Sequence, residues 1–421
     1  MQVFKFGGAS VKDASGVKNV CEIIRAHAKP EHVIVISAMG KVTNALEKIT
    51  DAILHKSEAV DALISALKEQ HFQIARELFP NANPVFDAID SLIAEIYWVA
   101  EESQLKNYDY EYDQIVSIGE LLSTRIVAAY LNASGIACEW VDARDLIRTD
   151  DTYREGEVDW QTTEAQVKQV YAKVRLQKPD SILLTQGFIA STSDNNSITL
   201  GREGSDYSAS ILAYCLDASE VVIWKDVPGV LNADPRIFPH AELLHKISYY
   251  DAIEMTYYGA TVIHPKTIKP LQNKNIPLRV KSFINPHEAG TIIGHTEQRN
   301  TTPTFIRKPE QVLISISPRD FSFIIEENIS EIFREIAKRR IKVNLMQNSA
   351  LNFSLCLNNE KDKIDAFREA LNLRYRVRYN DACELLTIRN YTDELVGLHA
   401  SGKNILLEQK SRNTIQLVLH N

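Results

Sequence analysis

Short runs of apolar residues alternate with longer amphipathic stretches from the first residues of the chain to about residue 295. The mainly apolar runs lie at 3–6, 33–36, 181–185, 221–224 and, more weakly, 276–280. Strands buried on both faces have this pattern, and they occur in parallel sheets covered by helices. We therefore predict a three-layer, open α/β fold with a mostly parallel sheet that binds its ligands at the carboxyl ends of the strands.

Between the predicted strands the apolar residues have helical spacing, and residues 45–133 hold four such stretches in succession. Two of them cover 58–79 and 85–105, and Pro80 and Pro84 mark the break between them. Because this block interrupts the alternation of strand and helix, we interpret it as a helical insertion. It serves either as plain scaffold or as a lid over a ligand.

The pattern changes after the polar segment 299–303, whose composition and proline are typical of a linker. Strands and helices then follow in the order β-α-β-β-α-β of a ferredoxin-like module. These elements are predicted at 311–317, 329–340, 343–346, 353–357, 361–371 and 384–388, followed by parts of a second unit at 393–399 and near Ile405 and Ile415. We predict one domain at 1–295 and a paired module at 301–421 whose second unit is trimmed.

The size and charge of the chain narrow the class of protein. It has 421 residues, too many for one core, and 45% of them are hydrophobic and 24% charged, as in ordinary globular proteins. The formal net charge is -8. Because a protein that wraps nucleic acid needs a basic surface, the whole chain is not expected to bind one.

The cysteines and the N-terminus indicate the compartment. The five cysteines are odd in number and form no C-x-x-C pair, which argues against a disulfide framework or a thiolate zinc site. The first residues, MQVFKFGG, do not have the pattern of a signal peptide, and no apolar run reaches the roughly 18 residues of a membrane span. We expect a soluble, cytoplasmic protein without a membrane partner.

The first candidate for chemistry is the segment 5–10, where a buried strand ends in Gly7 and Gly8. Glycines let a backbone approach a ligand closely, and the N–H groups at a helix N-terminus favour anions. Lys5 supplies a positive charge for a phosphate, and Ser10 is expected to cap a helix that begins at Val11. A tight turn with a surface lysine is the alternative interpretation.

A second glycine-rich segment, 201–206, precedes a helix at 207–216. Arg202 can bind a carboxylate through two hydrogen bonds, and the helix N-terminus favours the ionised form of Asp206. A simple helix cap would have the same sequence. A third segment, 224–236, leaves a buried strand and makes two turns, either to bind a nucleotide or as turns alone.

Two lesser features complete the set of candidates. Residues 37–44 follow the second predicted strand, and Glu120 is polar on an otherwise apolar helical stripe. Glu120 is either a surface residue or a carboxylate directed at the ammonium group of a ligand. His264 and Pro265 are typical of a structural helix start.

Motifs of several other enzyme classes are absent from the sequence. It has no G-x-S-x-G, H-E-x-x-H, H-R-D, D-F-G or G-x-G-x-x-G pattern, and no Walker A loop. In order along residues 1 to about 295, however, it has K-F-G-G-A-S, V-I-S-A-M-G-K-V-T-N, S-I-G-E-L-L-S-T, T-L-G-R-E-G-S-D, W-K-D-V-P-G-V-L-N-A-D-P-R and I-P-L-R-V-K-S-F-I-N-P-H-E-A-G-T. These motifs together resemble the aspartate kinase family of the amino acid kinase superfamily, whose members also have paired C-terminal ACT domains of ferredoxin-like fold.

The resemblance implies transfer of the γ-phosphoryl group of ATP to the side-chain carboxylate of L-aspartate, the first step of lysine, threonine and methionine biosynthesis. It implies that Lys5 and Asp206 are catalytic. The implied substrate-binding residues are Thr43, Glu120, Phe188, Arg202 and Ser205. The implied ATP-binding residues are Lys5, Gly7, Gly8, Ser10, Lys225, Asp226, Leu231, Arg236 and Lys281.

The chemistry is consistent with these implied roles. An aspartate side chain is ionised at pH 7, since its ordinary pKa is about 3.9, and no general base is required. The difficulty is that an anion must approach the triphosphate of ATP. Catalysis then depends on positioning, on cationic and N–H donors, and on Mg²⁺ bound to the phosphates.

The sequence departs from the family pattern at several places that bear on nucleotide binding more than on reaction type. Ala9 stands in place of Thr, Glu203 and Ala190 in place of Gly, Lys225 in place of Thr, and Leu231 in place of Tyr. Ile284 replaces a lysine of some members, for which Lys281 is the expected substitute.

The resemblance also implies regulation by lysine or threonine bound between ACT modules, in a homodimer or higher oligomer. The loop 325–328 and the strand 344–348 are the expected walls of that site. Two rival functions remain: an amino acid kinase acting on another acceptor, such as glutamate, N-acetylglutamate, carbamate or a nucleotide, and a degenerate kinase that only binds ligands. The retention of Lys5, Arg202 and Asp206 argues against the second.

Overall fold

The computed structural model describes residues 1–421 apart from 103–106, 261–262, 297–299, 321 and 421. The chain divides into two compact units, each with its own sheet and core. Unit 1 consists of Met1–Val230, Leu243–Ile253 and Val262–Arg299. Unit 2 consists of Leu231–Glu242, Glu254–Thr261 and Asn300–Asn421.

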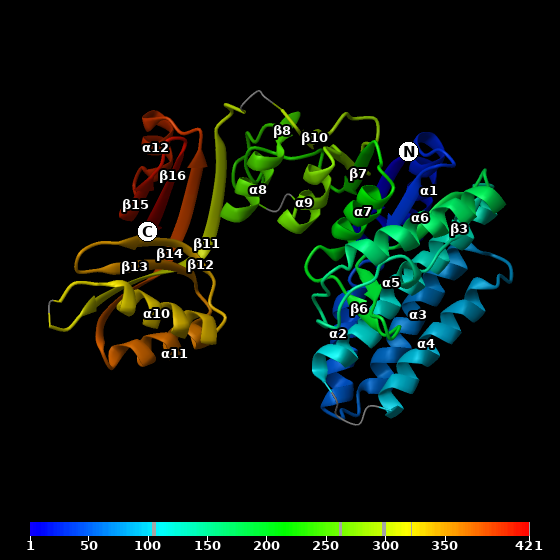
Figure 1. Cartoon of the computed structure of the whole chain (residues 1–421), viewed down its shortest axis with the longest axis horizontal. Helices are drawn as coiled ribbons and strands as arrows, with labels where there is room; N and C mark the ends of the chain where they lie inside the picture. The colour runs from blue at the N-terminus through cyan, green and yellow to red at the C-terminus, as the bar shows by residue number, and fades with distance from the viewer. Residues whose placement is uncertain (103–106, 261–262, 297–299, 321, 421) are drawn as a thin grey trace. The chain divides into compact units, whose positions relative to one another are not determined.

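Unit 1 contains an eight-stranded, mostly parallel sheet, as the apolar runs predict (Figure 1). Its strands, in spatial order, are β3 (Cys138–Trp140), β4 (Ile182–Gln186), β2 (Val33–Ile36), β1 (Gln2–Phe6), β7 (Glu220–Lys225), β9 (Leu278–Ser282), β10 (Thr291–Gly294) and β8 (Lys246–Ser248). Only the β9–β10 pair within this sheet is antiparallel. A separate hairpin pairs β5 (Ile189–Ser191) with β6 (Ser197–Thr199).

Helices cover this sheet. They are α1 (Ala14–His27), α2 (Val42–Leu54), α3 (Val60–Leu78), α4 (Val85–Glu102), α5 (Tyr108–Ala133), α6 (Trp160–Gln177), α7 (Gly204–Cys215) and α9 (Pro265–Asn273), with short 3-10 turns at Gly8–Val11 and Ala143–Asp145. Helix α8 (Tyr249–Tyr258) has residues in both units. Across the described residues we find no helix with the length and apolar character that crossing a bilayer requires.

The predicted helical insertion is present as α2 to α5, and it belongs to the main core of unit 1. Phe4, Phe6 and Trp224, which project from β1 and β7, share one cluster of buried residues with apolar side chains of α1 and of all four inserted helices. Because these helices bury their apolar stripes against the sheet's own cluster, they form a layer of the fold.

The start of α1 differs from the prediction. Ser10 does not cap a helix at Val11; residues Gly8–Val11 form a 3-10 turn, and the Ser10 hydroxyl donates to the Gly7 carbonyl oxygen at 2.6 Å. The α-helix begins at Ala14, where the Asp13 carboxylate accepts a hydrogen bond from the Gly16 N–H at 2.8 Å. Asp13 is a stronger N-cap than Ser10 here because its acceptor meets a free N–H of the first turn.

Unit 2 contains a six-stranded antiparallel sheet in the order β12-β13-β11-β14-β16-β15. Along the chain its elements are β11 (Thr304–Pro318), α10 (Glu326–Lys338), β12 (Val343–Asn348), β13 (Phe353–Asn358), α11 (Lys361–Asn372), β14 (Tyr375–Arg389), α12 (Asp393–Ala400), β15 (Asn404–Lys410) and β16 (Thr414–His420). The predicted order β-α-β-β-α-β is therefore confirmed, with a further helix and two strands behind it.

Two strands of unit 2 are much longer than their apolar runs indicate. β11 and β14 pair along their whole lengths, with register shifts between Lys308 and Leu313. On one side of this irregularity Val312, Ile314 and Ile316 share a core with α10 and α11. On the other side β14 pairs with β16, and residues of α12 pack against the core formed there. The two helix-covered cores are separate clusters, while a third cluster, which includes Leu345, Cys356 and Val418, joins strands of both halves of the sheet.

Candidate active site

A cavity of about 520 Å³ lies in unit 1 at the carboxyl ends of β1, β2 and β7. Since neighbouring parallel strands end at the same edge of a sheet, residues far apart in the sequence meet there. The cavity is lined by Lys5, Gly8, Ser37, Ala38, Gly40, Thr43, Tyr112, Glu120, Arg154, Phe188, Thr199, Gly201, Arg202, Glu203, Gly204, Ser205, Asp206 and Lys225.

A buried carboxylate between two lysines lies at this edge. Asp206, in the first turn of α7, has one oxygen 2.6 Å from Lys5 Nζ and the other 3.6 Å from Lys225 Nζ. Its burial would raise the pKa of Asp206, but the two ammonium groups outweigh that effect and lower the pKa below its ordinary value. The carboxylate is therefore ionised, and it fixes both lysines at the strand ends.

Glycine makes room for a ligand beside Lys5. A Cβ atom on Gly8 would lie 2.6 Å from the Ala38 carbonyl oxygen, and one on Gly7 would lie 3.3 Å from Lys5 Nζ. A side chain at Gly8 would force the backbone of the neighbouring strand end to move. The lysine and the bare backbone together form a cradle of the kind that binds phosphate.

Glu120 is the second buried carboxylate of the cavity, and it differs from Asp206. Only 3% of Glu120 is exposed, and its Oε2 atom has no hydrogen-bond partner among the described residues. Burial raises the pKa of Glu120 to about 8, although Lys5 and the Ala38 backbone act in the opposite direction. An ammonium group entering the cavity would supply the missing partner.

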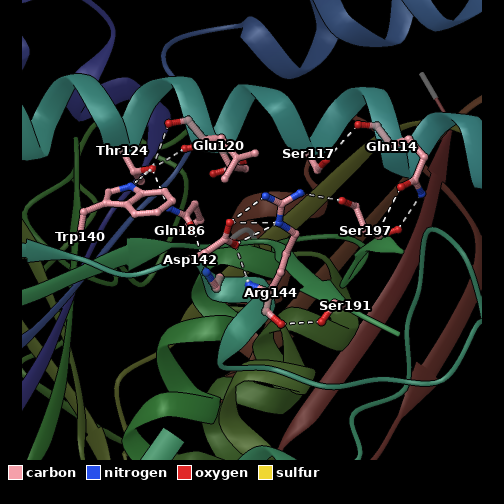
Figure 2. Close-up of polar contacts among 12 residues, drawn as sticks. Gln114, Ser117, Glu120, Thr124, Trp140, Asp142, Arg144, Gln186, Ser191 and Ser197 are labelled. Atoms are coloured by element: carbon pink, nitrogen blue, oxygen red, sulfur yellow. Dashed lines mark hydrogen bonds and ion pairs between the residues drawn. The ribbon is translucent and has the colours of Figure 1, made fainter. Parts of the chain in front are cut away.

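Hydrogen bonds fix the segment of α5 that carries Glu120 (Figure 2). The Thr124 hydroxyl donates to the Glu120 carbonyl oxygen at 2.9 Å and accepts from Trp140 Nε1 at 3.0 Å and Gln186 Nε2 at 2.8 Å. Ser123 donates to the Ser37 carbonyl oxygen at 2.7 Å, which ties the helix to the end of β2. These contacts hold Glu120 in place relative to the strand ends.

The other end of the same network anchors α5 to the β5–β6 hairpin (Figure 2). Gln114 exchanges two hydrogen bonds with the Ser197 backbone, at 2.9 and 3.1 Å. The Ser197 hydroxyl accepts from Arg144, whose guanidinium is paired with Asp142 at 2.7 Å. Because both ends are anchored, the position of Glu120 does not depend on a ligand.

The predicted acceptor-binding residues come together on one wall. Thr43, Phe188, Arg202 and Ser205 all line the cavity. Phe188 has a φ of 73°, and its N–H donates to the Ser208 hydroxyl at 2.9 Å, so that α7 supports this strained turn. A Cβ atom on the preceding Gly187 would lie 2.5 Å from the Cβ atom of Ser205, which explains why that position has no side chain.

Glu203, a departure from the family pattern, has a structural partner. It lies just before α7 with a φ of 54°, and its Oε2 accepts a hydrogen bond from the His264 N–H at 3.0 Å. His264 in turn caps α9, accepting from the Lys266 N–H, as the His-Pro pair predicts. The carboxylate of Glu203 is thus partly neutralised by a helix start instead of acting on Arg202 alone.

Sequence reasoning missed three residues that line the cavity, namely Tyr112, Arg154 and Thr199. The Arg154 guanidinium lies 4.3 Å from the ring centroid of Tyr112, and Asp113 accepts both the Arg154 N–H and the Thr199 hydroxyl at 2.7 Å. Burial raises the pKa of Asp113 to about 6. Thr199 opens the motif T-L-G-R-E-G-S-D, which could have drawn attention to it, whereas no signal marks Arg154.

The structure does not bring every predicted nucleotide residue to this cavity. Ser10 is 1% exposed and bonded to its own turn, and Asp226 is exposed outside the cavity lining. Lys281 lies over the Trp224 ring, 5.1 Å from its centroid, on the sheet face that carries Phe6 and not Lys5. Leu231 and Arg236 belong to unit 2, and their roles stay predictions.

The charges of the cavity favour a polyanion. Its lining holds four cations, Lys5, Arg154, Arg202 and Lys225. With a pKa of about 8 Glu120 is mostly protonated at pH 7, which leaves two ionised carboxylates against those four cations. Within the described residues, no cluster of three or more His, Cys, Asp or Glu side chains could hold a metal ion.

Comparisons with known proteins agree with this geometry. Residues 1–282 match the model of the amino acid kinase family. The chain is 32% identical to lysine-sensitive aspartokinase 3 of Escherichia coli, over 84% of this chain and 78% of that protein. It is 32% identical to chloroplastic aspartokinase 1 of Arabidopsis thaliana, over 85% of this chain and 63% of the relative. It spans only 42% of the chloroplastic bifunctional aspartokinase/homoserine dehydrogenase 2 of the same plant.

Solved structures of Escherichia coli aspartokinase III match nearly the whole chain. The complex with lysine and aspartate, in the T-state, has a TM-score of 0.85 at 27% identity, covering 99% of this chain and 95% of that one. The complex with aspartate and ADP, in the R-state, has a TM-score of 0.79 at 26% identity, covering 100% and 96%. Taken together, the family model, the relatives and the shared fold show that this chain belongs to the amino acid kinase family and, within it, to the aspartokinases.

Proposed function

We propose that the cavity of unit 1 transfers the γ-phosphoryl group of ATP to the side-chain carboxylate of L-aspartate, giving 4-phospho-L-aspartate and ADP. The observation that carries this proposal is that two cations, Lys5 and Lys225, share one cavity with a buried carboxylate, Glu120, whose Oε2 atom has no hydrogen-bond partner among the described residues. The two lysines suit a triphosphate, and Glu120 suits the ammonium group of an amino acid.

The acceptor, aspartate, is held by its α-carboxylate and its ammonium group. Arg202 binds the α-carboxylate through its guanidinium fork, while Glu120 accepts hydrogen bonds from the ammonium group. Thr43, Phe188 and Ser205 shape the wall between them. Fixing both charged groups of the amino acid leaves its side-chain carboxylate free to face the phosphate, and such positioning accounts for a large share of the barrier lowering in enzymes.

The phosphoryl donor, ATP, is held by residues at the carboxyl ends of the strands. Lys5 and the backbone at Gly7 and Gly8 lie where the γ-phosphate belongs, and Lys225 adds a second positive charge beside Asp206. The crystal structure of Escherichia coli aspartokinase III holds aspartate together with ADP, which supports a nucleotide in the same cavity. Mg²⁺ would accompany ATP, bound mainly by phosphate oxygens, and would supply further charge neutralisation there.

In the reaction an oxygen of the aspartate carboxylate bonds to the γ-phosphorus, and the bond between that phosphorus and the β–γ bridging oxygen breaks. ADP leaves with the bonding electron pair, so no proton needs to be removed from the nucleophile. Lys5 neutralises the charge on the transferring group as it passes between the two oxygens. Asp206 positions Lys5, and it acts through that lysine.

A coupled assay of ADP release with MgATP tests the proposal. Aspartate should be the best acceptor in a panel with glutamate, N-acetylglutamate, carbamate and UMP, and hydroxylamine should trap the acyl phosphate. A better rate with another acceptor would favour a different amino acid kinase. No ADP release with any acceptor would favour the rival function, a regulator that binds ligands without catalysis.

We also propose that unit 2 is a paired ACT-like regulatory domain that binds lysine or threonine. The relative from Escherichia coli is lysine-sensitive, and its T-state crystal contains lysine. Of the expected loop 325–328, only Ile325 precedes α10, and Asn328 lies in the first turn of that helix. The Asn328 side chain accepts from the Ile325 N–H at 3.0 Å and donates to the Tyr375 hydroxyl at 3.1 Å, which ties the helix start to one wall of the expected site. Equilibrium binding of lysine and threonine, with activity measured alongside, identifies the effector; binding of neither refutes this part.

A homodimer or higher oligomer fits the same region. β12 is an edge strand of the six-stranded sheet, and Phe323, Ile325, Met346 and Leu351 expose 40% or more of their surfaces around it. Open strand edges with apolar neighbours favour pairing with another chain. Sedimentation with a Met346→Glu variant tests this arrangement. The proposed activity implies a place at the start of lysine, threonine and methionine synthesis, and the cytoplasm stays the proposed location.

A further inference from the structure

Unit 2 contains a cavity of its own, distinct from the walls expected for the lysine or threonine site. It has a volume of about 510 Å³, within the range of small-molecule sites. Every residue that lines it belongs to unit 2. The walls come from the segment Leu231–Glu242, from the halves of β11 and β14 beside β16, and from α12 with Lys403.

One wall of this cavity is aromatic. The rings of Phe238 and Phe305 are stacked with centroids 5.4 Å apart, and His399 lies 4.7 Å from Phe305 and 5.5 Å from Phe238. Burial, followed by the charge of Lys403, lowers the pKa of His399, so its ring is neutral at pH 7. Three neutral rings in mutual contact form a shelf on which a further flat ring can pack.

A second group of lining residues is ionic and carries net positive charge. Glu384 is 7% exposed and is paired with both Arg307 and Lys403. Arginine has five N–H donors and lysine three, and the contacts with Glu384 use fewer than half of these eight. Two cations against one carboxylate leave an excess charge beside the shelf, which favours an anion.

The segment that closes the cavity is held rigidly. Asn232 exchanges backbone and side-chain hydrogen bonds with Glu242 at 2.9 and 2.7 Å, which closes the segment into a loop. It also accepts from the Phe305 N–H at 2.8 Å and donates to the Pro303 carbonyl oxygen at 3.1 Å. Because Asn232 docks the loop on β11, Phe238 keeps its place over Phe305, and the shelf exists before a ligand arrives.

We propose that this cavity binds a small anion with a flat apolar body, that is, an aromatic ring that carries a carboxylate or a phosphate. The ring packs on Phe238, Phe305 and His399, and the anionic group accepts hydrogen bonds from Arg307 and Lys403. The loop that the ligand covers also carries Leu231 and Arg236. Binding there is a property of unit 2 alone, and it stands or falls independently of the proposed phosphoryl transfer.

Calorimetric titration of the whole chain with phenyl phosphate tests the proposal, with inorganic phosphate and benzyl alcohol as probes that each keep one feature. Phenyl phosphate should bind at least about tenfold more tightly than either, since a charge-assisted hydrogen bond and a ring contact act together. The same titration is then carried out with 3-phenylpropionate, an aromatic carboxylate, and with AMP, a nucleotide. Whichever of these two compounds binds more tightly shows whether the cavity prefers an aromatic carboxylate or a nucleotide.

Substitutions in the cavity test whether phenyl phosphate binds there. Arg307→Gln, which keeps a hydrogen bond to Glu384, and Phe305→Leu should each weaken phenyl phosphate about tenfold. Arg374→Gln is the matched control, because it removes an exposed arginine of unit 2 paired with Glu331 far along the sheet from β16, and it should bind normally. Equal affinity for phosphate and phenyl phosphate, absence of binding, or unchanged affinity in both variants would overturn the proposal.

Discussion

Each unit of the molecule holds a buried carboxylate between two cations at the edge of a cavity, and the two cavities have nearly equal volumes. In unit 1 Asp206 pairs with Lys5 and Lys225. In unit 2 Glu384 pairs with Arg307 and Lys403. The resemblance ends there, because glycine backbone and Glu120 surround the first group, whereas aromatic rings surround the second.

The difference shows that a carboxylate and two cations do not by themselves make a catalytic site. Such a group can equally well be a satisfied ion network that holds strands together. Unit 1 adds a buried carboxylate without a partner, Glu120, and buried groups of this kind raise the free energy of the empty protein. A protein keeps such a destabilising group where a bound ligand supplies the missing hydrogen-bond partner. The contrast between Glu120 and Glu384 can therefore be tested by the same substitution at both.

The largest effect is expected at Lys5. Lys5→Ala should lower kcat at least a hundredfold, since loss of one preorganised donor to a developing charge costs about 2.7–4 kcal/mol of barrier. Lys225 still pairs with Asp206, so the circular dichroism spectrum should be unchanged. Lys168→Ala, which removes an exposed lysine of the same unit, is the control. Near-normal turnover of Lys5→Ala would remove the catalytic role.

Glu384→Gln should destabilise the protein by about 2–3 kcal/mol, because it leaves Arg307 and Lys403 without their shared carboxylate. Breaking a buried pair costs about 3–5 kcal/mol, and partial exposure of both cations reduces that figure here. Urea unfolding measures the change. Glu331→Gln, at an exposed pair, should cost under about 1 kcal/mol. An equal effect at both positions would show that Glu384 is not the buried centre of a network.

Glu120→Gln should instead stabilise the protein, by about 4 kcal/mol at pH 8, because the pKa of Glu120 is raised from 4.5 to about 8 and each unit corresponds to about 1.4 kcal/mol. The pKa of Glu120 is raised in the folded protein, so the stability of its neutral form is complete below the unfolded value and is lost as the pH rises through about 8. The advantage of glutamine should therefore be small near pH 4.5 and grow towards pH 8. Stabilisation that is independent of pH would contradict the assigned burial.

A smaller effect is expected at the second lysine of the active-site group. Lys225→Thr, which restores the usual residue of the family, should lower kcat/KM for ATP about tenfold, the equivalent of one charge-assisted hydrogen bond. Lys225→Arg should retain more activity than Lys225→Thr. If threonine instead raises kcat/KM, the lysine is a tolerated departure and not a contact of the phosphates.

Much of the site could be predicted because parallel strands bring their ends together. Lys5, Glu120 and the pair Arg202 and Asp206 lie on three separate segments, yet each motif places its residues at a strand end or on a helix near it. Arg154 lies in a turn without periodicity, and Thr199 ends the three-residue strand β6, which is too short to show a pattern. Their positions depend on the tertiary contacts of Asp113.

Departures from expectation have physical causes as well, although the nucleotide role of Lys281 stays a prediction. Ser10 was given the role of a helix cap, but Asp13 offers the better acceptor three residues later. Lys281 lies one position along β9 from the face that holds Lys5, and a change of one residue in a strand reverses the side. The long strands β11 and β14 include alternating polar residues, so their apolar runs show only part of each strand.

The central claim is that the missing partner of Glu120 is the ammonium group of aspartate, and proton release on binding tests it most directly. Calorimetry at pH 7 in buffers of different ionisation enthalpy counts the protons that aspartate displaces. Because the pKa of Glu120 is about 8 in the empty cavity, the wild-type protein should release close to one proton per aspartate bound, and Glu120→Gln should release none. Binding of aspartate without proton release, or equal release from both proteins, would contradict the account.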